Sequence, residues 1–155
     1  MTTIEAAVRN VQSRFTDKSD DDLYAELGLR TIAIPREPSL AGEFAPDIAA
    51  DDFPRPPKAE LINLGRRLFQ RWERELYRFL CEEEKTDEKK RLVSAILGKD
   101  KSATAIVTGL LVSAFGLSPA IAVLVGALIL RILVVPAGET ICEYWSERLA
   151  VRTTA

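Results

Sequence analysis

The chain has 155 residues, of which 47% are hydrophobic and 28% are charged, and its formal net charge is −2. This size suits one domain with a single core, and the acidic balance argues against nucleic acid as a partner. Histidine is absent, and so are the glycine-rich, serine and paired-cysteine motifs of common enzymes and metal sites. We therefore predict no enzymatic activity, no cofactor, no metal site and no small-molecule substrate.

Two cysteines, Cys81 and Cys142, lie far apart in the sequence and within helical patterns. Because neither belongs to a closely spaced pair, we expect buried free thiols and a reducing compartment. The first fifteen residues contain Glu5, Arg9 and Arg14 and lack the apolar run of a secretory signal. These features predict a location in the cytoplasm or on the cytoplasmic face of a membrane.

The first 30 residues predict a pair of helices. Apolar residues recur at helical spacing from Ile4 to Phe15, and Thr3 is placed to cap this first helix. A second helix begins after Ser19, where three aspartates favour the start of a helix, and Gly28 is placed to end it.

Residues 31–56 predict an extended proline-rich arm. Six prolines occur between residues 31 and 58, where no helical or strand period is sustained. Thr31–Ile34 form either a short strand or a segment that places two isoleucines on the core. The arm either wraps around the helices or docks on a partner, and the sequence leaves both open.

Residues 57–155 predict a helical bundle, which starts with a long amphipathic helix from Pro57 to about Glu84. Its apolar stripe consists of Leu61, Leu64, Leu68, Trp72, Leu76, Phe79 and Leu80. Its other side carries arginines at steps of four, three and four residues, namely Arg67, Arg71, Arg74 and Arg78. Such a row of cations suits an anionic surface or an acidic partner, but interleaved glutamates are also typical of a solvated face.

A short helix over Asp87–Leu97 leads to the most unusual part of the chain, 29 uncharged residues from Ser102 to Leu130. Gly116–Pro119 interrupts this run, so we predict a hydrophobic helical hairpin over residues 102–135. Each arm is about 22 Å long, against roughly 30 Å for the hydrocarbon core of a bilayer. The apolar residues expected to contact lipid or a protein core are Ile106, Leu110, Leu111, Phe115, Ile121, Leu124, Leu128 and Ile129.

Small residues recur on both arms of the hairpin, at Ala105, Gly109 and Ser113 and at Ala122 and Gly126. Such ridges let two helices approach closely, in lipid or in a protein core. Basic residues lie on both sides of the hairpin and none lies in its turn, as expected if both ends stay cytoplasmic. A last helix follows Gly138 and ends at about Val151.

The sequence therefore predicts an all-α fold, a helical bundle around a central hydrophobic hairpin with an extended arm. The hairpin either forms the core of the bundle, or is inserted in a membrane, or is buried in a bundle that opens to expose it. The pattern of Ala103–Val135 resembles the buried hairpin of pore-forming bacteriocins, which implies the third alternative. We expect a non-enzymatic function through membrane association or insertion, as an effector, anchor or pore component. The alternative is an adaptor or assembly subunit that binds a partner protein, or further copies of itself, through the arm or the arginines.

Overall fold

The computed structural model describes residue 15, residues 17–44, residues 46 and 48, and residues 56–82, 103–134 and 141–154. Every regular element in this part of the chain is helical, with no strand, and this confirms the predicted all-α class. Of the helix expected over residues 3–15, only Phe15 is described. The helix expected over residues 87–97 lies outside the described residues.

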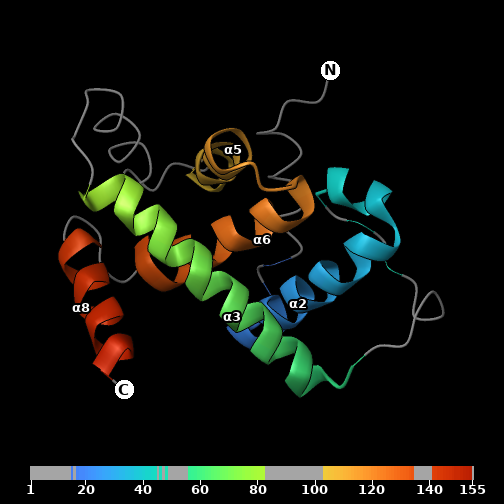
Figure 1. Ribbon diagram of the computed structural model, residues 1–155, viewed down its shortest axis with the longest axis horizontal. Coiled ribbons are helices and arrows are strands. Elements are labelled where there is room, and N and C mark those ends of the chain that lie inside the picture. Colours follow the sequence, from blue (N-terminus) through green and yellow to red (C-terminus); the bar gives the residue numbers. More distant parts are fainter. Residues whose placement is uncertain are drawn as a thin grey trace.

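Five α-helices and three shorter turns make up the described part of the chain. They are α2 (Asp20–Arg36), the 3₁₀ helix η1 (Pro38–Gly42), α3 (Lys58–Tyr77), the π-helical turn η2 (Arg78–Glu82), α5 (Ala103–Phe115), α6 (Pro119–Ile129), the π-helical turn η3 (Leu130–Val134) and α8 (Ile141–Thr154). In Figure 1, α3 runs diagonally across the molecule, with α2 beside its first half and α8 beside its second half.

Helix α2 begins where the sequence predicts. The Ser19 hydroxyl accepts from the backbone N–H of Asp22 at 3.1 Å, and the Asp22 carboxylate accepts from the backbone N–H of Ser19 at 3.2 Å. The helix does not end at Gly28, however, but continues to Arg36. Thr31–Ile34 are therefore helical, so the suggested strand is wrong. The two isoleucines, Ile32 and Ile34, do pack half-buried against the core, as the other alternative suggested.

Gly28 is needed for a close helix crossing and not for a helix end. A Cβ atom on Gly28 would collide with the backbone carbonyl oxygen of Leu61, and one on Gly65 would collide with that of Tyr24. Helices α2 and α3 thus touch backbone to backbone at two glycines, one from each helix. Beside this crossing, the rings of Tyr24 and Phe69 pack edge to face at 5.7 Å.

Two exposed ion pairs flank the same crossing. Lys58 Nζ lies 2.7 Å from Asp22 Oδ1, and Arg66 Nη2 lies 3.1 Å from Asp21 Oδ1. The hydrogen bond from Lys58, followed by those from Ser19, lowers the pKa of Asp22 to about 2. The aspartates that start α2 therefore also bind the first half of α3.

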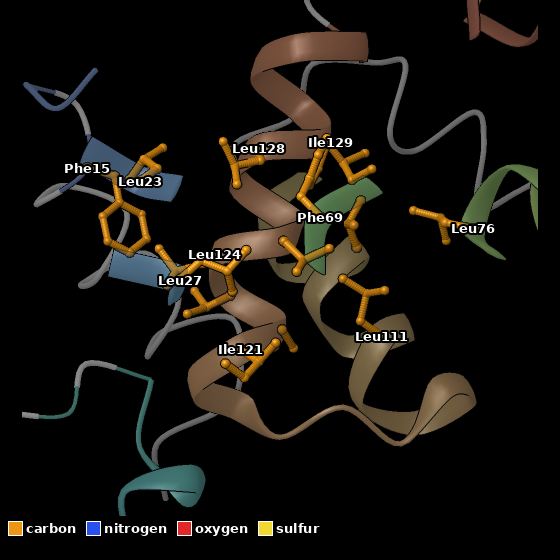
Figure 2. Packing of buried hydrophobic residues seen from close by; sticks show 14 of the residues in the cluster. Phe15, Leu23, Leu27, Phe69, Leu76, Leu111, Ile121, Leu124, Leu128 and Ile129 are labelled. Atoms are coloured by element: carbon orange, nitrogen blue, oxygen red, sulfur yellow. The ribbon is translucent and has the colours of Figure 1, made fainter. Parts of the chain in front are cut away.

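Helix α6 forms the centre of the core. Nine of its residues are buried, Ala120 to Gly126 together with Leu128 and Ile129, so this helix has no polar or exposed side. Figure 2 shows Leu124 and Leu128 of α6 facing Leu23 and Leu27 of α2, while Leu111 of α5 and Phe69 of α3 lie on other sides. No helix in the described ranges is both long and apolar enough to cross a bilayer.

Helices α5 and α6 are joined by residues 116–118 and pack against each other. Gly116 has a φ of +67°, a left-handed conformation that favours glycine, and the N–H of Leu117 donates to the carbonyl of Leu111 at 3.1 Å. Ser118 begins α6 through its backbone carbonyl, which accepts from the N–H groups of Ile121 and Ala122. The Ser118 side chain makes no capping bond.

The small residues of the two helices have different surroundings. Ala122 and Gly126 are buried, and a Cβ atom on Gly126 would lie 2.9 Å from Thr108 Oγ1 of α5. Gly109 instead borders open space, and Ser113 is exposed. Because Val107 and Leu111 bury larger apolar side chains, they and Thr108 form the inner side of α5. Of the ridge expected at Ala105, Gly109 and Ser113, Ala105 is buried in the main core, whereas Gly109 and Ser113 are turned away from α6.

A disulfide joins Cys81 of η2 to Cys142 of α8, with a Cα–Cα distance of 5.7 Å and a sequence separation of 61 residues. The prediction of two free thiols is therefore wrong. Spacing along the chain contains no sign of this pair, because only the packing of α8 beside the end of α3 brings the two residues together.

We predict that Gly65→Ala lowers the free energy of unfolding by about 2–3 kcal/mol, because its methyl group displaces the backbone of α2. The matched control is Gly109→Ala, also inside a helix but next to open space, which should raise stability by up to about 1 kcal/mol. Urea denaturation followed by circular dichroism measures both. Equal stabilities for the Gly65 variant and the parent protein would contradict the close crossing.

Candidate interaction surface

The four arginines predicted as a contact row lie together on the outer side of α3 and η2. Arg67, Arg71 and Arg74 belong to α3 and Arg78 begins η2, and all four side chains are exposed. Steps of three and four residues place them on one helix face. We call these four residues the arginine stripe.

Most of the charge on the arginine stripe is not neutralised by neighbouring carboxylates. Within the described residues, Arg67 and Arg74 make no ion pair, and Arg78 lies 4.0 Å from Glu75. The Arg71 guanidinium lies 5.9 Å from the ring centroid of Trp72. The neighbouring Arg66, by contrast, is engaged with Asp21 and with the Tyr24 ring.

Half-buried aromatic rings border the arginine stripe. Phe115, at the end of α5, packs edge to face on Trp72 at 6.2 Å and on Phe79 at 5.6 Å between ring centroids. We call Trp72, Phe79 and Phe115 the aromatic flank. Continuing along α5, Ser113 and Ala114 are exposed and Leu110 is half-buried. Cations and apolar groups are therefore adjacent on one surface, although Glu75 is also exposed there.

This arrangement corrects the predicted apolar stripe of α3. The buried residues of α3 are Leu61, Gly65, Phe69, Glu73 and Leu76. Leu64, Leu68, Trp72 and Phe79, which the sequence suggested for the buried stripe, are only half-buried. The buried face of α3 is rotated about the helix axis relative to the predicted stripe, because Gly65 allows the close approach of α2. This rotation leaves the aromatic flank at the surface.

The predicted hairpin residues divide between buried and half-buried positions. Leu111, Ile121, Leu124, Leu128 and Ile129 are buried in the main core, whereas Ile106, Leu110 and Phe115 are half-buried. This difference in burial follows from the places of the two helices, because α6 lies inside the bundle and α5 covers one of its sides.

A buried carboxylate beneath α8 was not anticipated. Glu73 is fully buried, and its Oε1 accepts from Trp145 Nε1 at 3.1 Å and from Arg148 Nε at 2.7 Å. The Trp145 ring also packs edge to face on Tyr77 at 5.5 Å. The sequence contained one sign of this burial. Glu73 lies four residues after Phe69, which places it on the same side of the helix as Leu61 and Gly65.

Two arginines bind the two ends of α6. Arg30 is 4% exposed and donates to the carbonyls of Ala120 and Phe44, each at 2.9 Å, and to Glu26 at 3.0 Å. Burial lowers the pKa of Arg30, while Glu26 acts in the opposite direction. Arg30 follows Leu23 and Leu27 at helical spacing, so the sequence contained a sign of its burial.

Arg131, just beyond α6, binds the segment that precedes α2. It donates to the carbonyls of Lys18 at 2.6 Å and Phe15 at 2.9 Å, and it lies 3.3 Å from Asp20. Its guanidinium is therefore occupied by backbone carbonyls and by the Asp20 carboxylate.

The comparisons with known proteins are negative. No family model, no curated protein and no solved structure matches the chain. The similarity to pore-forming bacteriocins thus remains one of sequence pattern.

In the described ranges, no group of three or more metal-binding side chains is placed to hold an ion.

We predict that Arg30→Met lowers the free energy of unfolding by about 2–4 kcal/mol, because three charge-assisted hydrogen bonds in the interior are lost. The control is Arg67→Met on the exposed stripe, which should change stability by no more than about 0.5 kcal/mol. Urea denaturation of the three proteins tests this. A similar small change in both variants would show that Arg30 does not hold α6.

Proposed function

We propose that the protein is a non-enzymatic helical bundle that binds the surface of an anionic membrane through the arginine stripe and the aromatic flank. The observation that supports this proposal best is the adjacency of exposed arginines, three of them without an ion pair in the described structure, and half-buried aromatic rings. Arginine near lipid phosphates and aromatic rings at the headgroup level are typical of interfacial binding.

The strength of this binding can be estimated from the charges. A basic residue close to an anionic leaflet contributes about 1 kcal/mol, so the stripe contributes roughly 4 kcal/mol before the opposing effect of Glu75. Partial burial of the aromatic flank adds to this attraction. The expected association is reversible and weakens as salt screens the charges.

Surface binding is favoured over insertion of α5 and α6. Inserting these helices requires breaking the hydrogen bonds of Arg30 to Ala120 and of Arg131 to Phe15 and Lys18. The 13 residues of α5 also span only about 20 Å, less than the hydrocarbon core. We therefore propose that the hydrophobic hairpin stays at the centre of the bundle when the protein binds lipid.

A second candidate is an adaptor or assembly subunit whose partner protein presents an acidic surface. The observation in its favour is that the arginine stripe carries bidentate donors, which match carboxylates as well as phosphates. In both candidates the stripe makes the contact, so the nature of the partner distinguishes them.

We predict that Arg71→Glu, Arg74→Glu and Arg78→Glu together reduce binding to vesicles of phosphatidylcholine and phosphatidylglycerol at least tenfold, because attraction becomes repulsion. Flotation of the protein with vesicles at low and at physiological salt measures this. The control is the triple Arg→Lys variant, which keeps the charge and should retain most of the binding.

Three outcomes separate the alternatives. Binding by the parent protein that is lost in the Glu variant, with unchanged circular dichroism, supports the membrane function. Absence of vesicle binding, together with capture of a partner protein that the Glu variant does not bind, supports the adaptor. If neither is observed, the stripe is a solvated face and the proposal is wrong.

A further inference from the structure

Within residues 142–150, helix α8 contacts the bundle through one buried side chain and three half-buried ones, of which Cys142 and Leu149 pack against the main core. Among residues 142–150, whose side chains the structure describes, only Trp145 is buried. Its ring lies against Tyr77, and its Nε1 and the guanidinium of Arg148 both bind Glu73. Five other side chains of this stretch are exposed, namely Glu143, Tyr144, Ser146, Glu147 and Ala150.

The disulfide adds a covalent link at the first turn of this weakly covered helix. Cys142 is the second residue of α8, and Cys81 lies in η2, which directly continues the helix that carries Glu73 and Tyr77. Both cysteines are half-buried and not enclosed by the core. Part of each cysteine residue is therefore open to solvent, the side from which a thiol reductant approaches.

From this geometry we propose that Cys81–Cys142 is a redox-sensitive link that controls the attachment of α8. When the bond is intact, α8 is held beside α3 and Trp145 stays buried against Tyr77. When it is reduced, the noncovalent contacts alone retain α8, and the helix detaches for part of the time. Detachment uncovers Glu73, Tyr77 and the apolar side of Trp145. This inference does not depend on the proposed binding to membranes.

The chemical step requires a dithiol reductant of the kind that cells keep in their reducing compartments. One thiolate of the dithiol attacks a sulfur of the Cys81–Cys142 bond and forms a mixed disulfide. Its second thiol then resolves that bond, so that Cys81 and Cys142 each gain a proton and the dithiol becomes a disulfide. Two electrons pass to the protein, and oxidation of the two thiols reverses the step.

Hydrogen exchange of the full chain, before and after reduction with dithiothreitol, tests the proposal. Backbone amides in residues 145–154 should exchange at least tenfold faster after reduction, while those of α2, α3 and α6 keep their protection. The double variant Cys81→Ser and Cys142→Ser should behave like the reduced protein and should not respond to dithiothreitol.

Tryptophan fluorescence provides a second measurement. The chain has two tryptophans, so Trp72→Phe leaves Trp145 as the only reporter. Reduction should make Trp145 at least twofold more accessible to the quencher acrylamide, and reoxidation should restore the original value. Unchanged exchange and quenching after reduction would overturn the proposal, because the bond would then be structural only. Loss of protection in all helices together would overturn it as well, because the whole fold would depend on the bond.

Discussion

Everything in this fold follows from the need to enclose α6 on all sides. A helix with buried residues around its full circumference has no side to present to water, so other elements must cover it completely. In the described structure α2, α3 and α5 supply much of this cover, each through an apolar side. Burying a side chain of the size of leucine contributes about 1.5–3 kcal/mol, so this central helix accounts for a large share of the driving force.

The need to cover α6 also explains where glycines and charged side chains occur inside the bundle. Gly28 and Gly65 bring α2 and α3 into backbone contact, which lets both helices reach the same core. At its two ends α6 must leave the apolar environment, and there Arg30 and Arg131 bind carbonyl oxygens. The disulfide links the first turn of α8 covalently to η2, at the end of α3.

Sequence patterns predicted the all-α class, the start of α2 at Ser19 and the exposure of the arginine stripe, because these depend on local spacing and capping. They did not predict the continuation of α2 past Gly28, since a glycine that ends a helix and one that permits a helix crossing look the same in sequence. The burial of Glu73 and the Cys81–Cys142 bond depend on the position of α8, which is a matter of tertiary packing. These three errors have one origin, since a single sequence does not show which distant residues are in contact.

The arginines fall into two groups, those engaged within the fold and those exposed on the outer surface. Arg30, Arg131 and Arg148 form ion pairs with Glu26, Asp20 and Glu73, so their charges are largely neutralised within the fold. The arginine stripe is left exposed on a chain whose net charge is −2. Because charges in physiological salt are screened beyond about 8 Å, a partner at this surface senses the stripe and not the total charge of the protein. An acidic chain can therefore present a cationic surface, and in the proposed binding mode the aromatic flank beside it adds an apolar contact that charge alone does not supply.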